Sequence, residues 1–315
     1  MERVESEAML AQVREGRLLP AGASLVAMLS GGRDSVCLLD LATRLLGADS
    51  VTVLHVNYGL RDDSDEDEAH CTALCADLGV RLKVERPRRP EGPGNLQAWA
   101  RDTRYAAAAQ LALPQGALIA TGHTADDQVE TILYRLASSP SRRALLGIRP
   151  HDGSLVRPLL EFTREQTTRY CEERGLAWRD DPTNDGNGYA RNRVRHKLGP
   201  ALAEIHPAAA RNVLRTAELL REEAEVLDAL VAAELDGSGD TPRSTIRLER
   251  LAELPRALRR LVVQQLADGA AGRPVPGAAR HADEVAALRR TGRAMLDLGS
   301  GVRAVAERGV LHAER

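Results

Sequence analysis

The residues best suited to chemistry near the N-terminus form the run Ser30-Gly31-Gly32-Arg33-Asp34-Ser35. The run lies between an apolar stretch and an amphipathic one, which predicts the order strand, glycine-rich turn and helix. Adjacent glycines allow positive φ and turn backbone N–H groups inward, and the new helix directs its positive end at the same point. Serine hydroxyls can donate to phosphate oxygens, and Asp34 suits a divalent cation that bridges to them. The run therefore predicts a site for a Mg²⁺-bound nucleotide.

The loop differs from the two commonest glycine-rich phosphate loops. No Gly-Lys-Ser/Thr follows the glycines, and they lack the spacing of the dinucleotide-binding fingerprint. A strand-to-helix turn without a ligand is the alternative interpretation. The run resembles the SGGxDS loop of the ATP-pyrophosphatase (PP-loop) superfamily, whose members activate an oxygen by adenylation and release pyrophosphate.

A second chemical motif, Gly122–Thr131, follows the fourth apolar stretch and opens a helix. Asp127 and Glu130 are three residues apart, so they share one helical face and can converge on a cation or an ammonium group. His123 lies just before them. The alternative is that Asp126 caps the helix and the other acids suit its first turn. Capping explains one acid but not three beside a histidine, so the motif favours a functional site.

Basic residues are concentrated in two places although the net charge is only −2. Arg101 and Arg104 share one helical face, where their guanidinium groups can hold nucleotide phosphates or RNA. Residues 188–215 carry one acid and six basic residues: Arg191, Arg193, Arg195, Lys197, Arg211 and Arg215. Such a block favours binding to phosphates or nucleic acid, with a solvated basic helix face as the alternative.

The apolar pattern predicts how these residues are positioned. Helical segments separate five short apolar stretches, at 24–29, 51–56, 80–84, 117–121 and 155–160. This alternation predicts an α/β fold with a doubly wound, parallel, five-stranded sheet, which binds ligands at the carboxyl ends of its strands. Strand signals fade after about residue 201, where a long helix, 207–235, leads to a smaller, mainly helical part. We expect a catalytic domain at 1–205 and an accessory domain at 206–315.

Composition sets further limits. The chain has 315 residues, 43% of them hydrophobic and 28% charged, which is typical of a globular protein. No apolar run approaches the roughly 20 residues of a membrane span, so we expect a cytoplasmic protein without a membrane partner. The four cysteines are too scattered for a disulfide scaffold. Cys71 and Cys75 are four apart on a predicted helix and invite a metal interpretation, but packed, reduced thiols explain them better.

Seven segments occur in the order and approximate spacing of the tRNA(Ile)-lysidine synthase family, which the chain resembles over residues 24–200. They are Ser30–Ser35, His55–Arg61, Arg101–Tyr105, Gly122–Thr131, Val156–Leu160, Asp181–Asn184 and Arg191–Arg195. The resemblance implies that ATP adenylates the C2 oxygen of the wobble cytidine in the CAU anticodon of tRNA(Ile). Free L-lysine then displaces AMP to give lysidine, so that the tRNA reads AUA and accepts isoleucine.

The resemblance also implies residue roles. It assigns ATP binding to residues at the ends of the first two strands and to one arginine: Met28, Ser30, Gly31, Gly32, Arg33, Asp34, Ser35, His55, Val56 and Arg104. It assigns the Mg²⁺ to Asp34 and the lysine to His123, Asp127 and Glu130, with orientation of Mg²⁺ as an alternative role of Asp127 and Glu130. It assigns catalysis to Asp34, Asp127, Glu130 and Arg191. It assigns tRNA contacts to the accessory domain and to Arg191, Arg193, Arg195, Lys197 and Arg211.

Some positions depart from the family pattern. Thr124 and Tyr58 stand where the family often has histidine, so a role of those imidazoles does not transfer. A PP-loop tRNA thiolase is an alternative, but sulfur transfer needs a cysteine pair or cluster ligands, and Cys71-x-x-x-Cys75 fits poorly. A non-catalytic tRNA-binding protein is another, disfavoured by the intact acids. The sequence leaves the oligomeric state open, a homodimer included.

Overall fold

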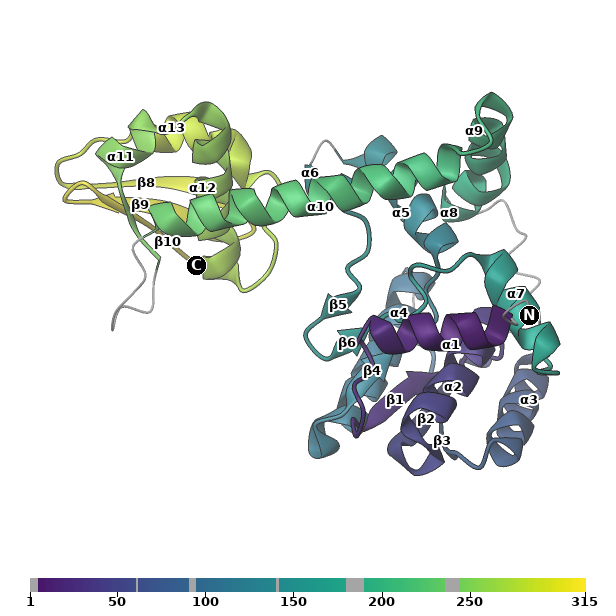
Figure 1. Cartoon of the computed structure of the whole chain (residues 1–315). Helices are drawn as coiled ribbons and strands as arrows, with labels where there is room; N and C mark the ends of the chain where they lie inside the picture. The colour runs from purple at the N-terminus through teal and green to yellow at the C-terminus, as the bar shows by residue number, and fades with distance from the viewer. Residues whose placement is uncertain (1–4, 61, 91–94, 140–141, 180–189, 236–243) are drawn as a thin grey trace. The chain divides into compact units, whose positions relative to one another are not determined.

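The computed structural model describes residues 5–60, 62–90, 95–139, 142–179, 190–235 and 244–315. The chain divides into two compact units, Met1–Glu218 and Leu219–Arg315 (Figure 1). The division falls inside the long helix α10 (Ala209–Glu234), whereas the sequence placed a boundary just before this helix. None of the helices that the structure describes is both long and apolar enough to cross a bilayer.

The first unit is built on a six-stranded sheet of order β3-β2-β1-β4-β6-β5. Its strands are β1 (Leu25–Met28), β2 (Val51–Val56), β3 (Arg81–Glu85), β4 (Leu118–Ala120), β5 (His151–Asp152) and β6 (Leu155–Val156). The five expected strands are parallel, which confirms the α/β class. The sixth strand, β5, pairs antiparallel with β6. The sequence missed it because two exposed polar residues give no apolar signal.

The central strand β1 is buried on both faces, and its side chains alternate between two cores. Leu25 and Ala27 pack into the core formed with α1 (Glu5–Glu15), α2 (Arg33–Leu46) and α7 (Arg164–Glu173). Val26 and Met28 face the opposite core.

The opposite core is formed with α4 (Leu96–Ala112). The remaining helices of this unit are α3 (Ser64–Asp77), α5 (Ala125–Ser138), α6 (Arg142–Leu145), α8 (Ala190–Arg193) and α9 (Gly199–Ile205). The strand order reverses between β1 and β4, so the ligand crevice of this doubly wound sheet lies between their carboxyl ends.

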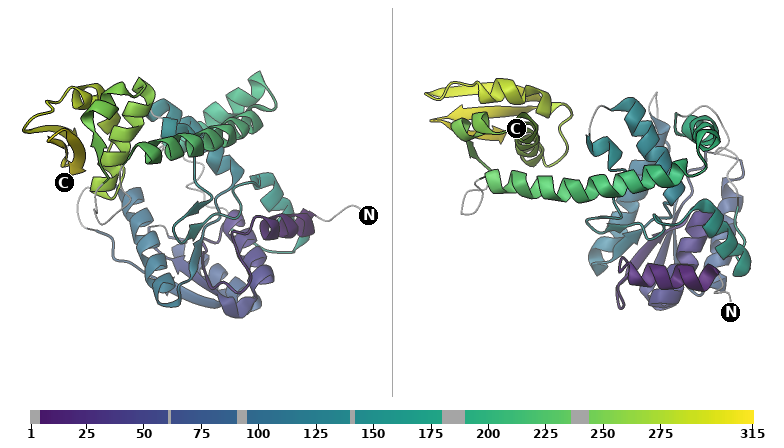
Figure 2. Two further views of the ribbon diagram at one scale, coloured as in Figure 1. Left: turned by 60° about the vertical axis from the view of Figure 1, so that its left-hand side comes forward. Right: turned by 45° about the horizontal axis from the view of Figure 1, so that its top comes forward.

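The second unit has more residues in helices than in strands, as expected, but it also holds a sheet that the sequence did not predict. It contains an antiparallel sheet of order β7-β10-β9-β8, and its helices pack against that sheet (Figure 2). The strands are β7 (Ile246–Arg247), β8 (Arg293–Gly299), β9 (Val302–Glu307) and β10 (Val310–Glu314). The helices are α11 (Leu248–Glu253), α12 (Arg256–Ala271) and α13 (Ala282–Ala286).

The amino-acid composition of these strands gives little sign of the second sheet. Its inward positions include small residues of low strand propensity, Ala304, Ala306 and Ala313, so pairing and burial override local preference. The tight turns that join its strands were the available signal, since Gly301 and Gly309 adopt positive φ there.

A buried polar cluster fixes α7 on α2. The Asp40 side chain, only 2% exposed, accepts a hydrogen bond of 2.5 Å from the Tyr170 hydroxyl and one of 3.1 Å from Arg174 Nε. A buried carboxylate is costly unless it is paired, so these two residues of α7 hold the helix in one position on α2. Because these contacts hold the end of α7 on α2, they also help to set where the first turn of α7 lies.

We predict that Tyr170→Phe destabilises the first unit by about 1–3 kcal/mol, because the buried Asp40 carboxylate loses a hydrogen bond. Urea unfolding followed by circular dichroism measures the loss. Tyr134→Phe is the matched control, since the Tyr134 side chain is exposed, and should unfold like the parent. Equal stability of the two variants would contradict the role given to the cluster.

Candidate active site

The phosphate loop, Ser30–Ser35, joins β1 to α2, and hydrogen bonds of Ser35 hold the loop together. The Ser30 backbone N–H donates to Ser35 Oγ at 3.1 Å, and the Ser35 hydroxyl donates to the Gly32 carbonyl at 2.7 Å. Gly31 has φ +86°, which a residue with a side chain rarely adopts. Ser35 is therefore buried inside the loop, whereas Ser30 is exposed and available to a ligand.

Gly122 brings the end of β4 against this loop. A Cβ atom on Gly122 would lie 2.8 Å from the carbonyl oxygen of Asp34 and 3.0 Å from the Ser35 nitrogen. Only glycine permits such a close approach of the two backbones. The start of α5 consequently lies next to the first turn of α2, at the crevice that the strand order predicts.

The acidic residues at the start of α5 have different hydrogen-bond partners from those that the sequence suggested. Thr124 and Asp127 form the capping box of the helix, and Asp127 Oδ2 accepts the Thr124 backbone N–H at 2.9 Å. Asp126, the residue considered as a cap, instead accepts the Arg164 backbone N–H at 2.8 Å, at the start of α7. Glu130 is buried, and its side chain is 9% exposed.

Arg164, which sequence reasoning missed, joins the loop to the acid pair. Its guanidinium donates to Asp127 Oδ1 and to Glu130 Oε1, each at 2.8 Å. Its Nε lies 3.8 Å from Asp34 Oδ2. Thr167, one turn further along α7, donates to Asp34 Oδ1 at 2.5 Å. The only sequence signal was the capping box of Thr163 and Gln166, which starts α7 and is confirmed.

Burial shapes the charges of this cluster. Burial raises the pKa of Asp34, opposed by the hydrogen bond from Thr167 and by the nearby Arg33 and Arg164. Burial opposes the charge of Arg164, but Asp127 and Glu130 outweigh it and raise the pKa of the guanidinium. An incoming cation or phosphate therefore meets a pre-formed ionic site.

The residues expected to border adenine lie together at the ends of β1 and β2. Met28, His55 and Val56 are buried. His55 Nδ1 lies 3.0 Å from the Leu29 carbonyl, which can only accept, so Nδ1 carries the proton. In the neutral ring Nε2 is then an acceptor, and it has no hydrogen-bond partner among the residues that the structure describes.

The other predicted residues are placed as follows. Arg104 Nε is buried without a hydrogen-bond partner in the described part of the chain, and its guanidinium lies 5.8 Å from the Tyr105 ring. His123 Nδ1 is 2.7 Å from the Thr121 hydroxyl. Arg195, expected to contact tRNA, donates from Nε to Glu130 Oε1 at 2.9 Å and so joins the ionic cluster.

Part of the predicted site lies outside the described residues. These are Asp181–Asn184, Arg61 and the side chain of Arg191, although the Arg191 backbone belongs to α8. Arg193, Lys197 and Arg211 are exposed.

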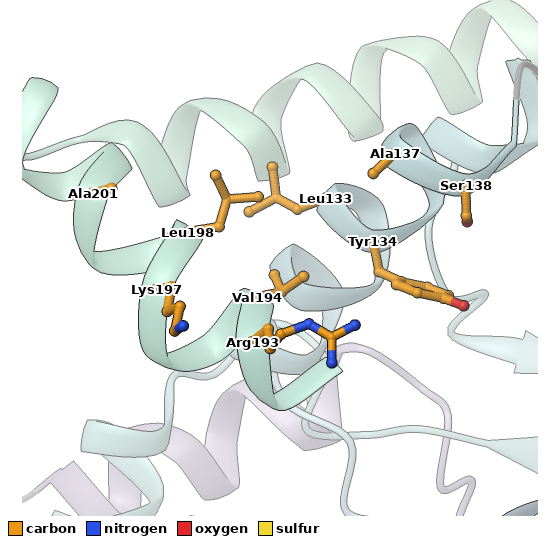
Figure 3. Close-up of a pocket in the computed structure, with 9 residues that line it drawn as sticks. All are labelled: Leu133, Tyr134, Ala137, Ser138, Arg193, Val194, Lys197, Leu198 and Ala201. Atoms are coloured by element: carbon orange, nitrogen blue, oxygen red, sulfur yellow. The ribbon is translucent and has the colours of Figure 1, made fainter. Parts of the chain in front are cut away.

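An apolar groove of about 570 Å³ lies beside the ionic cluster, between α5 and the segment 193–201 (Figure 3). Leu133, Tyr134 and Val194 line it, and Arg193 and Lys197 border it from the segment 193–201 (Figure 3). Glu130 and Leu133 are three residues apart on α5, so the ionic cluster and the groove follow each other along one face of the helix.

The cysteines are buried, as the sequence predicted. Burial raises the pKa of Cys71 to about 12 and that of Cys75 to about 11, which makes both poor thiolate donors. Among the described residues, no group of three or more His, Cys, Asp or Glu side chains is arranged to hold a metal ion.

A glycine-rich loop after β1, an adjacent acid motif after β4 and a doubly wound sheet define the class of PP-loop proteins. The family model described as a PP-loop domain matches residues 4–202. Curated relatives narrow the class further. The chain is 37% identical over 306 residues to the tRNA(Ile)-lysidine synthase of Nocardia farcinica, covering 94% of each. The chain belongs to the tRNA(Ile)-lysidine synthase family.

Other relatives are longer. The chain is 40% identical over 256 residues to the Thermus thermophilus tRNA(Ile)-lysidine synthase, covering 79% of this chain but 50% of that protein. It thus spans about half the length of several curated relatives that it matches. Among solved structures, the U34-tRNA thiolase NcsA from Methanococcus maripaludis is similar at a TM-score of 0.58 and 16% identity. That match covers 69% of this chain and 79% of NcsA, and it shows the fold alone.

We predict that Gly122→Ala weakens ATP binding by about tenfold or more, equivalent to about 1.4 kcal/mol, because a Cβ there displaces the first turn of α2. Isothermal titration calorimetry with ATP measures the loss. Gly269→Ala in α12 is the control, since its added Cβ would have no atom within 4 Å apart from its chain neighbours and the backbone of its own helix, and it should bind ATP normally. Unchanged affinity in Gly122→Ala would contradict the close approach.

Proposed function

We propose that this chain ligates L-lysine to C2 of the wobble cytidine in the CAU anticodon of tRNA(Ile). The observation that supports this proposal is the meeting of Asp34, in the phosphate loop, with Asp127 and Glu130 around one guanidinium. Groups suited to a nucleotide and groups suited to an amine thus face the same space. The names of the relatives supply the reaction, and the cluster supports its two halves.

In the first half, the C2 oxygen of the cytidine attacks the α-phosphorus of ATP, and pyrophosphate leaves. The loop N–H groups and the exposed Ser30 hydroxyl hold phosphate oxygens. Mg²⁺ commonly uses one or two carboxylates together with phosphate oxygens, and Asp34 beside the loop fits this role. Bound there, Mg²⁺ would neutralise charge on the phosphates. The unpartnered His55 Nε2 suits the exocyclic amino group of adenine, which donates a hydrogen bond.

In the second half, the ε-amine of lysine attacks C2, a C–N bond forms, and the C2–O bond breaks as AMP leaves with the oxygen. The amine must lose a proton before attack, and a carboxylate of the pair Asp127 and Glu130 can accept it. Arg104 and Arg195 are suited to balance charge that grows on the α-phosphate. Arg191 keeps the catalytic and tRNA-contacting role that the family resemblance implies.

The tRNA substrate fits the basic surface of the first unit. Arg193 and Lys197 beside the groove, together with Arg211, offer cations to the phosphates of the anticodon stem and loop. The second unit is proposed as the accessory tRNA-binding domain. We propose the cytoplasm as its location, because tRNA, ATP and free lysine are all available there.

Sulfur transfer is less well supported, although a tRNA thiolase has a similar fold. Cys37 and Cys171 contact each other, and Cys71 and Cys75 share one face of α3. All four thiols are buried, and burial raises the pKa of Cys37 as well as those of Cys71 and Cys75. Buried thiols of high pKa are neither nucleophiles nor ready cluster ligands.

The central test is mass spectrometry of tRNA nucleosides after incubation of the chain with unmodified tRNA(Ile), ATP, Mg²⁺ and L-lysine. We expect lysidine in place of one cytidine, and we expect Asp34→Ala to form neither AMP nor lysidine. Pyrophosphate release that depends on neither tRNA nor lysine would contradict the proposal.

We further predict that Glu130→Gln impairs lysine transfer more than adenylation, because the neutral amide weakens the hold on the ammonium group but leaves the loop intact. Pyrophosphate release reports the first step and lysidine the second. We expect lysidine formation to fall by about 100-fold with a smaller loss of pyrophosphate release. Equal losses in both steps would remove Glu130 from the lysine site.

A further inference from the structure

Arg164 occupies the place that the proposed function gives to a substrate cation. Its guanidinium donates to Asp127 Oδ1 and Glu130 Oε1 at 2.8 Å, and its side chain is only 18% exposed. The ammonium group of lysine needs oxygens of the same two carboxylates. Two cations at one pair of carboxylates repel each other, so Arg164 and the substrate compete for them.

The backbone of Arg164 is fixed by the start of α7, whereas its guanidinium is joined to that backbone through a flexible chain of methylene groups. The Arg164 N–H donates to Asp126 at 2.8 Å, and the capping box of Thr163 and Gln166 fixes the start of α7. Thr167 anchors the next turn to Asp34. By contrast, the guanidinium is held by ion pairs alone at the end of three methylene groups, and a stronger anion can draw it away.

The phosphate loop brings such an anion within reach. Arg164 Nε lies 3.8 Å from the Asp34 carboxylate, so the guanidinium already stands beside the loop that binds the nucleotide. Guanidinium groups bind phosphate oxygens in a bidentate manner, as they do carboxylates, and ATP carries several such oxygens. The phosphates of a bound nucleotide can therefore compete with Asp127 and Glu130 for the Arg164 guanidinium.

We propose that Arg164 makes lysine binding depend on ATP. Without nucleotide, the guanidinium occupies Asp127 Oδ1 and Glu130 Oε1. With nucleotide, it transfers to the phosphates, and the ammonium group can take its place at the two carboxylates, while Arg195 stays on Glu130. Arg164 is thus an ordering residue that admits the amine only after the activating nucleotide. The inference rests on the proposed function, because it takes lysine as the amine.

The test is calorimetric titration of L-lysine into the full chain, with and without saturating α,β-methylene ATP, which cannot release pyrophosphate. For the parent protein we expect lysine to bind about tenfold or more tightly with the nucleotide analogue, within the usual range of coupling between sites. For Arg164→Met we expect the two affinities to be equal, because lysine then binds without the analogue. A merely structural role would weaken lysine binding in both states instead.

Two further variants complete the test. Arg169→Met, on the exposed side of the same helix, should keep the parent's coupling. Arg164→Lys keeps the charge but lacks the planar guanidinium fork that binds carboxylate and phosphate oxygens in a bidentate manner, so it should show intermediate coupling. It replaces Arg164→Met if that variant fails to fold in a thermal melt.

The outcomes separate the two proposals. Equal lysine affinity with and without the analogue in the parent, or weaker binding in both states of Arg164→Met, overturns the ordering role alone. If the parent binds the analogue but never lysine, the proposed function fails and this inference with it.

Discussion

The ion pairs of Arg164 are the interaction on which the candidate site depends. Asp34 comes from the phosphate loop, and Asp127 and Glu130 come from α5, so three carboxylates meet at the ends of two neighbouring strands. Like charges this close repel unless a cation lies among them. Arg164 supplies that cation from a third element, α7. The cluster therefore depends on the docking of α7 on α2, and Arg195 adds a second cation at Glu130.

The docking of α7 is itself explained by buried polar groups. Asp40 on α2 binds Tyr170 and Arg174 of α7, and Thr167 binds Asp34. Because each buried polar group needs a hydrogen-bond partner, α7 can dock on α2 in one position only. Gly122 adds a further constraint, because its missing side chain lets the end of β4 touch the phosphate loop. Contacts that take no part in the reaction thus position the phosphate loop, the acid pair and the guanidinium.

Much of this was predictable, and the failures have physical causes. The five parallel strands and the capping box at Thr163 follow local patterns, and both are confirmed. The sheet of the second unit was missed because alanine-rich strands become strands only through pairing and burial. Helix α1 was missed too, although its residues Met9 and Val13 join the main core.

The sequence alone determined the phosphate loop, the acid motif and the family, because glycine conformation, helical spacing and motif order are local properties of the chain. Only the tertiary structure decided which cations meet those acids. Arg164 is 34 residues from Glu130 and lies in no recognised motif, and Arg195 comes from a segment expected to face tRNA. Ion pairs between distant elements depend on how helices pack on the sheet, and no local pattern encodes that arrangement.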